Sequence, residues 1–548
     1  MSSKINFENS NVQEKTETTK GKITVFDSTL RDGAQAEGVS FSVEDKIKIV
    51  KALDKLGLDY IEAGNPGSNP KDMEFFERIK DVKLRSTKIA AFGSTRRRNI
   101  SPAEDGNIQA LLSAGTDVVA IFGKSWHFHV TDIIGATLRE NLEMIYDTIA
   151  YLKEQGKTVV FDCEHFFDGY KENSEYALKT IESAVQAGVD CVCLCDTNGG
   201  TFPTEIYDIT KKVVDTFDVM VGIHAHNDCG MAVANSIMAI EAGATHLQGT
   251  FTGFGERCGN ADLSTLIANL QIKKGYDCIP KENMSELMHT ARAVSETANL
   301  QLSIRQPYVG KCAFAHKGGM HVDGVLKNPR SFEHIDPSLV GNERQFLTSE
   351  VSGRTAILSM IQKIAPGVEK NSPETTAVID KLKELEYEGY QFEGAEGGFE
   401  LLVRKTLGKY KPFFELENFK IVTENPATSD DNTASAMIKV KVDDKYEITA
   451  AEGEGPVNAL DKALRKALEV FYPTLSSVHL TDYKVRVLDS TSATASKVRV
   501  LIESGDGTES WTTVGVSKDI IEASRKALVD SIEYKLIKEV EKKYRQYI

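Results

Sequence analysis

The chain has 548 residues, of which 41% are hydrophobic and 26% charged, and its formal net charge at pH 7 is −15. This length predicts two to four domains, with enough apolar surface for large cores. The acidic balance disfavours nucleic acid and anionic membrane surfaces as partners. Eight cysteines in a chain of this length argue against a disulfide-rich secreted protein.

The N-terminal segment is polar and lacks the apolar region of a secretory signal. We expect residues 1–20 to form a flexible tail. No apolar run in the sequence approaches the length of a membrane span. These features predict a cytoplasmic protein without a membrane partner.

From Lys22 to about Leu270, short β-rich runs alternate with amphipathic segments that have the pattern of helices. Eight runs are present, nearly continuously apolar: ITVFDST, DYIEAGN, TKIAAFG, DVVAIFG, TVVFDCE, DCVCLCDT, VMVGIHAH and THLQGTF. Apolar strands that alternate with helices predict a covered parallel sheet. Eight units in roughly 250 residues predict a (β/α)₈ TIM barrel. A doubly wound open sheet is the alternative, which the count of eight and the lack of GxGxxG disfavour.

The pattern changes after the barrel. Residues 296–410 are helical and loop-rich, and NSPETT at 371–376 marks an internal joint. Beyond Lys411 two strands and a helix occur, and a similar order recurs with an extra strand, which indicates an internal duplication. We therefore expect an α/β chain with a tail (1–20), a TIM barrel (21–295), helical linker subdomains (296–410) and a duplicated strand–strand–helix α+β domain (411–548).

Polar residues follow the predicted strands at the end of the barrel where active sites lie. His224 and His226 are two apart on the seventh strand, so their side chains point the same way. Asp32 follows the first strand and Asn260 the eighth. Such a nitrogen and oxygen set suits Mg²⁺, Mn²⁺ or Zn²⁺. An isolated His-x-His is at least as often structural, but the expected convergence with Asp32 and Asn260 favours a metal.

Three more polar residues occupy the same end of the barrel. Arg31, beside the predicted metal, suits an enolate or oxyanion, although a salt bridge is the plain alternative. Glu164 ends the fifth strand. Thr197 ends the sixth, where a hydroxyl and backbone N–H groups can hold a small carboxylate or cap the next helix.

These residues lie in motifs that resemble the isopropylmalate, homocitrate and citramalate synthase family. The matching motifs are DSTLRDGAQ at 27–35, CDTNGG at 195–200, HAHNDCGMAVANS at 224–236, GFGERCGNA at 253–261 and FAHKGGMHVDGV at 314–325. The resemblance implies an acyltransferase of the EC 2.3.3 class that condenses acetyl-CoA with a small 2-oxo acid. FDCEHFFDGYK at 161–171 and HIDPSLVGNER at 334–344 look most like the citramalate branch, which implies pyruvate as substrate.

The resemblance also assigns roles. It implies that Asp32, His224 and His226 bind the metal, with Asn260 joining them or lying close by. It also implies catalytic or substrate-binding roles for five further residues. Arg31 would polarise the keto oxygen and stabilise the enolate, Gln35 would orient the residues around the metal, and Thr197 would bind the substrate carboxylate. Glu164 would act in acid–base chemistry or position acetyl-CoA, and His321 would be a catalytic histidine from the linker. In one departure, Phe332 stands where relatives often have tyrosine, and a phenyl ring cannot donate a proton.

Assembly and regulation follow from the same resemblance. It implies a homodimer in which His321 acts in its own barrel or in the partner's. The domain at 411–548 resembles the regulatory domain of isopropylmalate synthases, which implies feedback inhibition by isoleucine or leucine. Isoleucine is favoured because citramalate leads to it.

Other activities are compatible with parts of the sequence. An isopropylmalate synthase would need room for a branched chain, and a homocitrate synthase would need a basic residue for the distal carboxylate of its substrate. The sequence does not give the pocket volume that separates these two from a citramalate synthase. A hydroxyacyl-CoA lyase would share Arg31, Asp32 and the two histidines, but would have no reason to carry the linker and the duplicated domain. A biotin-dependent carboxyltransferase would need a carrier-lysine motif such as MKM, which is missing. A catalytically silent regulator would not need intact metal ligands.

Overall fold

A computed structural model describes residues 19–346, 357–358, 361–362, 364–369, 371–392, 394–423, 434–488, 496–507 and 509–545. They form two compact units, one of residues up to 314 with 335–343, the other of 315–334 with the residues from 344 onward. The predicted tail lies almost entirely outside the described residues. Within the described part, none of the helices has both the length and the apolar content needed to cross a bilayer.

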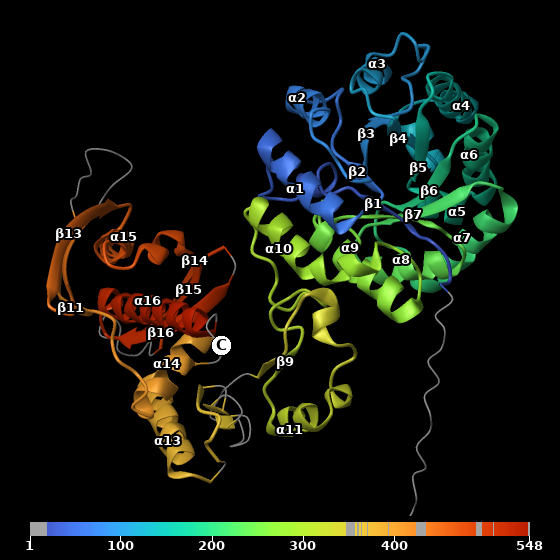
Figure 1. Cartoon of the computed structure of the whole chain (residues 1–548). Helices are drawn as coiled ribbons and strands as arrows, with labels where there is room; N and C mark the ends of the chain where they lie inside the picture. Colours follow the sequence, from blue (N-terminus) through green and yellow to red (C-terminus); the bar gives the residue numbers. More distant parts are fainter. Residues whose placement is uncertain are drawn as a thin grey trace, which may run out of the picture. The chain divides into compact units, whose positions relative to one another are not determined.

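The first unit contains a closed barrel of eight parallel strands in sequential order (Figure 1). The strands are β1 (Thr24–Asp27), β2 (Tyr60–Glu62), β3 (Lys88–Ser94), β4 (Val118–Lys124), β5 (Thr158–Glu164), β6 (Cys191–Asp196), β7 (Met220–Ala225) and β8 (His246–Gly249). The barrel closes where β1 pairs with β8, with Asp27 opposite Gly249. The predicted TIM barrel is therefore confirmed, and an open sheet is excluded.

Helices follow the strands and cover the outside of the barrel (Figure 1). They are α1 (Val43–Leu56), α2 (Pro70–Ile79), α3 (Gly106–Ser113), α4 (Leu138–Glu154), α5 (Phe166–Glu172), α6 (Ser174–Gln186), α7 (Pro203–Thr216), α8 (Ala232–Glu241), α9 (Leu263–Ala268) and α10 (Leu287–Thr297). Local chemistry sets their ends: α1 begins at a capping box of Ser42 and Asp45 and ends at Gly57, whose φ of 95° favours glycine.

The barrel has two apolar layers. The larger one lies between strands and helices. The smaller one fills the barrel's interior with Phe26, Ala90, Val118, Ala120, Val160, Cys191 and Cys193. The sixth-strand cysteines are thus small packing residues. Since the interior is filled, polar chemistry is confined to the mouth of the barrel.

The second unit begins with small elements of the region between barrel and C-terminal domain. β9 (Ala315–His316) pairs in parallel with β10 (Gln345–Phe346), and α11 (Gly319–Lys327) lies between them in the chain. Further along, α13 (Pro373–Glu388) and α14 (Glu396–Thr406) share an apolar cluster with Val514 of the C-terminal domain. The three-domain boundaries at 295 and 410 stay a prediction.

The C-terminal part contains two copies of one unit, each a three-stranded antiparallel sheet followed by a helix. The first copy comprises β11 (Glu415–Thr423), β12 (Ala434–Val442), β13 (Lys445–Gly453) and α15 (Pro456–Glu469), and the second β14 (His479–Val487), β15 (Val498–Gly505), β16 (Ser510–Ser517) and α16 (Ile520–Arg545). The duplicated α+β fold is confirmed. The sequence did not predict β11, so both copies have the third strand that we expected only in the second.

Candidate active site

Three potential metal ligands converge at the mouth of the barrel. Asp32 lies just beyond β1, and its Oδ2 is 3.2 Å from Nε2 of His224 and 3.7 Å from Nε2 of His226. The two Nε2 atoms are 3.4 Å apart. All three residues are buried. Ligands about 2.1 Å from a shared ion lie roughly 3.0–3.4 Å from one another. Two of the three distances lie in this range and the third, 3.7 Å, is close to it, so the cluster can hold one divalent metal after a small adjustment.

Asn260 lies next to this cluster. Its backbone forms a bridge with His226, and its Nδ2 donates to the carbonyl of Phe254 at 3.1 Å. The Asn260 side chain is buried, and its Oδ1 has no protein hydrogen-bond partner among the described residues. Because a buried polar atom without a partner is costly, this oxygen suits a ligand that the protein itself does not supply.

Electrostatics prepare the cluster for a cation. Burial alone would raise the pKa of Asp32, but the Arg31 guanidinium and the two histidines outweigh it and hold that pKa well below its usual range. Burial and the neighbouring His224 lower the pKa of His226 to about 4, so its imidazole is neutral at pH 7. A neutral imidazole beside a carboxylate is the form that binds metals.

Arg31 is fixed by three contacts. Its Nε donates to Oε2 of Glu62 at 2.6 Å, and its Nη1 lies 3.3 Å from Oδ2 of Asp32. The guanidinium carbon lies 3.8 Å from the centre of the Phe92 ring. The salt bridge named as the alternative therefore exists, and it holds the guanidinium beside the Asp32 carboxylate. A fork oriented in this way can also donate to an oxyanion at the cluster.

Glu164 is paired with a lysine that the sequence analysis did not consider. Lys124 ends β4 directly opposite Glu164 at the end of β5, and the two side chains form an ion pair. The lysine ammonium also lies 5.4 Å from the centre of the Phe122 ring. The carboxylate is thus held in place at the rim, and its side chain keeps some exposure to solvent.

Thr197 is part of a set of linked loops. Its Oγ1 accepts a hydrogen bond from the backbone N–H of His165 at 2.9 Å, which leaves the hydroxyl hydrogen to be donated elsewhere. Its carbonyl accepts from Nη2 of Arg257 at 2.7 Å, and Arg257 also pairs with Asp228. Arg257 therefore ties the loops after β6, β7 and β8 together. Thr197 does not cap a helix: α7 begins later, at Pro203.

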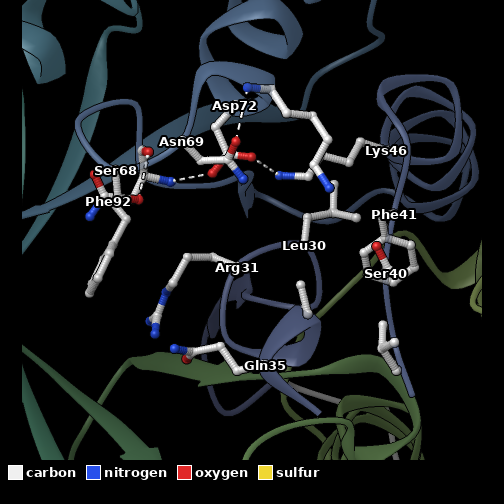
Figure 2. A pocket seen from close by; sticks show the side chains of 14 residues that line it. Leu30, Arg31, Gln35, Ser40, Phe41, Lys46, Ser68, Asn69, Asp72 and Phe92 are labelled. Carbon is white, nitrogen blue, oxygen red and sulfur yellow. Dashed lines mark hydrogen bonds and ion pairs between the residues drawn. The ribbon is translucent and has the colours of Figure 1, made fainter. Parts of the chain in front are cut away.

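Gln35 lines a cavity beside Arg31. The cavity has a volume of about 310 Å³, and Figure 2 shows the side chains of Arg31 and Gln35 reaching into it. On the opposite wall, the buried Lys46 donates to Asp72 at 2.6 Å and holds the loop after β2. The cavity adjoins the cluster through Arg31, and its polar lining suits a substrate rather than core packing.

His321 lies in the second unit, on α11. Its ring stacks on Phe332, with 4.1 Å between ring centres and an angle of 21°. Phe332 is thus a packing partner of the predicted catalytic histidine. The catalytic role of His321 stays a prediction.

A second group of potential ligands lies on β5 and β6. Asp162, Cys193 and Cys195 bring ligand atoms close together. Burial raises the pKa of the Cys193 thiol well above its usual value, however, and Oδ1 of Asp162 already accepts from Gln248 at 2.9 Å. Metals bind thiolates rather than thiols, so we assign no metal here.

The sequence analysis missed Glu62, Lys124 and Gln248, which contact the predicted site residues. Glu62 and Lys124 are the last residues of β2 and β4. A search of the carboxyl end of every predicted strand would have found both residues. Gln248 lies inside β8, and only the three-dimensional structure places it against His224.

In the comparison with known proteins, each part of the chain matches a protein family. Residues 22–294 match the HMGL-like family, residues 308–389 the homocitrate synthase post-HMGL domain-like family, and residues 393–536 the LeuA allosteric (dimerisation) domain. Among solved structures, an HMG-CoA lyase of Bacillus subtilis is 21% identical, covers 52% of this chain and 96% of its own, and has a TM-score of 0.45. The residues that form the closed barrel are thus those that match the HMGL-like family.

The curated relatives define the family more narrowly. The (R)-citramalate synthase of Aquifex aeolicus is 51% identical over 95% of this chain and 99% of its own length, and that of Geobacter sulfurreducens is 50% identical over 95% and 98%. A probable 2-isopropylmalate synthase of Methanopyrus kandleri is 32% identical over 93% and 98%. The chain belongs to the citramalate synthase family. It is accordingly an acyltransferase, and the lyase, carboxyltransferase and silent-regulator alternatives lose their support.

Proposed function

We propose that this chain condenses acetyl-CoA with pyruvate and hydrolyses the resulting thioester, which gives citramalate and CoA. The observation that carries the proposal is the identity of about half of all residues with (R)-citramalate synthases along almost the full chain. Two relatives named probable 2-isopropylmalate synthase are 32% and 30% identical over a similar length, and one further (R)-citramalate synthase is 32% identical. The contacts at the barrel mouth provide the groups that the reaction needs.

We place the substrate ketone at the cluster of Asp32, His224 and His226, where the side-chain oxygen of Asn260 would be the fourth ligand of the metal. Mg²⁺ or Mn²⁺ suits this set, and Zn²⁺ is the alternative. Such an ion, when bound, acts as a Lewis acid that polarises the keto oxygen. Arg31 donates to the oxygen that gains negative charge in the condensation.

The other residues bind substrate and move protons. The Thr197 hydroxyl donates to the carboxylate of pyruvate. Glu164, held by Lys124, removes a proton from the methyl group of acetyl-CoA, a step worth about 10²–10⁴-fold. Gln35 and the cavity beside Arg31 position the thioester end. We propose His321, from the same chain or from the partner subunit, as a further proton donor or acceptor.

The choice of 2-oxo acid is tested with three substrates side by side. Thiol release from acetyl-CoA is measured with pyruvate, 2-oxoisovalerate and 2-oxoglutarate, and the products are identified by mass spectrometry. We expect pyruvate to give the highest kcat/KM. A higher value with 2-oxoisovalerate would make the chain a 2-isopropylmalate synthase, and a higher value with 2-oxoglutarate a homocitrate synthase.

Assembly and location are part of the same proposal. The match of residues 393–536 to the LeuA allosteric (dimerisation) domain supports a homodimer and an effector site in the C-terminal part. We propose isoleucine as the effector and leucine as the alternative, because the product is a precursor for isoleucine biosynthesis. The enzyme works in the cytoplasm, where acetyl-CoA and pyruvate are available.

A further inference from the structure

A buried glutamine on β8 contacts one of the two histidines of the cluster. Oε1 of Gln248 lies 3.0 Å from Nδ1 of His224, and Gln248 is fully buried. On its other side, Nε2 of Gln248 donates to Oδ1 of Asp162 at 2.9 Å. The same nitrogen lies 3.4 Å from Nε2 of His246. The three polar atoms around the amide therefore decide which way it points.

The orientation of the amide follows from Asp162. The amide nitrogen faces Asp162 and the amide oxygen faces His224. An ionised Asp162 can only accept hydrogen bonds, which favours this orientation. Burial lowers the pKa of His246 to about 3, so its ring is neutral and its Nε2 can accept the second amide hydrogen. Both hydrogens and the oxygen of the amide then have partners, and the reverse orientation would leave two acceptors facing each other.

The orientation of the amide in turn sets the tautomer of His224. An amide oxygen can only accept, so Nδ1 of His224 carries a hydrogen, and in the neutral ring Nε2 then carries the lone pair. That Nε2 is the nitrogen which lies 3.2 Å from Asp32 and 3.4 Å from His226. His226 has no such support, since its buried Nδ1 has no protein partner among the described residues.

We propose that Gln248, anchored by Asp162, is a positioning residue that fixes the His224 tautomer and ring orientation for metal binding. This inference rests on the proposed metal ligands. Hydrogen bonds to the outer nitrogen of a metal-bound histidine are typically worth 10–100-fold in metal affinity. Gln248 does not touch the substrate in this role, and its effect on turnover passes through the metal.

The test measures Mn²⁺ binding to the full-length, metal-free protein by electron paramagnetic resonance of the free ion. Gln248→Met keeps the size of the side chain but removes the acceptor, and we expect the Kd for Mn²⁺ to rise about 10–100-fold. Gln248→Glu keeps an oxygen facing His224 but loses the donor to Asp162, so we expect it to restore the affinity only in part. The matched control is Gln271→Met, because Gln271 also hydrogen-bonds Cys278 and Ile279 but contacts none of the cluster.

Each outcome is decisive. If the wild type binds no Mn²⁺, the proposed metal site itself is wrong. If the wild type binds and Gln248→Met binds equally well, the positioning role is wrong and the metal site stands. If Gln248→Met does not fold, Gln248→Asn is used instead, because its shorter side chain moves the amide oxygen away from His224 and disturbs the packing less. Unchanged Mn²⁺ affinity in that variant overturns the inference. Thermal unfolding without metal separates a loss of affinity from a loss of stability.

Discussion

Asp32 is the residue on which the positive groups of the barrel mouth converge. It contacts Arg31, His224 and His226, and it stays ionised although it is buried. Removal of this carboxylate leaves three nitrogen groups facing one another without an anion between them. A metal bound there would lose its oxygen ligand and face uncompensated repulsion from Arg31.

We predict that Asp32→Ala and His224→Ala each reduce metal-dependent thiol release by more than about 100-fold, since loss of an outer-sphere partner alone costs 10–100-fold. The measurement is kcat/KM for pyruvate at saturating Mn²⁺, with circular dichroism as the check on folding. Wild-type protein treated exhaustively with a chelator should be equally inactive. Undiminished turnover after chelation would refute the metal assignment.

Arg31 gives a second prediction at the residue scale. Its guanidinium contacts Glu62 through Nε and Asp32 through Nη1, and it also stacks on the Phe92 ring. A lysine has one nitrogen and cannot make these contacts together. We expect Arg31→Lys to lower kcat by about 10²–10³-fold, the usual cost of one oxyanion donor. A variant with near-normal kcat would show that Arg31 does not bind the developing charge.

Single residues at the site were predictable from sequence to the extent that strand ends were recognisable. His224 and His226 share one strand, so their common direction follows from the two-residue repeat alone. The partners of these residues come from other strands. That Lys124 lies opposite Glu164, and Gln248 against His224, depends on barrel register, which no local pattern contains.

At the scale of elements, β11 shows why a strand can escape a sequence pattern. Its register shifts between Leu416 and Asn418, so the inward-facing Leu416 and Phe419 are separated by three residues rather than two or four. A bulge of this kind breaks the alternation on which strand prediction depends. β14 has the same irregularity between Leu480 and Asp482, which supports the duplication.

Helix α16 carries a buried carboxyl group that should make the C-terminal unit sensitive to pH. Glu533 is 1% exposed and accepts a hydrogen bond from the backbone N–H of Phe413 at 3.0 Å. Burial raises its pKa from 4.5 to about 7. The folded state therefore binds this proton more tightly than the unfolded state, and the group's contribution to stability is lost as pH rises from about 4.5 to 7.

We predict that Glu533→Gln, which keeps an acceptor for Phe413, stabilises the C-terminal unit at pH 8 relative to the wild type by up to about 3 kcal/mol, and by much less at pH 5. Urea unfolding is followed by the fluorescence of Trp511, which is buried in this unit, in a Trp126→Phe background. A difference between variant and wild type that does not change with pH would contradict the raised pKa of Glu533.

At the scale of the whole molecule, assembly is the first question. Open sheet faces of the C-terminal part expose large apolar residues, among them Met437, Ile448, Val485 and Val487. Such residues are typical of surfaces that another chain covers. We expect light scattering on fully active protein to give twice the chain mass of 60.3 kDa. A mass near that of one chain, with full activity, would exclude the homodimer.

Regulation requires a physical connection between the C-terminal domain and the helices that precede it. Helix α14 is joined to α16 by two ion pairs. The side chains of Glu400 and Lys538 are 2.7 Å apart, and those of Lys405 and Asp530 are 2.8 Å apart. Val514 of β16 belongs to the apolar cluster of α13 and α14. A truncation near Lys411 would therefore uncover α14 and damage the remaining enzyme, so the effector is better tested in the intact chain.

We predict that isoleucine inhibits the intact enzyme, and leucine less so, with a coupling of about 1–3 kcal/mol between effector and substrate. Glu400→Gln weakens the ion pair that joins α14 to Lys538 of α16 and should reduce this coupling, while the uninhibited rate stays unchanged because the site residues are untouched. The matched control is Glu175→Gln, which removes an exposed pair with Lys179 on the barrel helix α6. Inhibition curves are measured by thiol release at subsaturating pyruvate. An intact enzyme indifferent to both amino acids at millimolar concentrations would leave the C-terminal domain with a structural role only, and a Glu400→Gln variant inhibited like the wild type would exclude α14 as the connection.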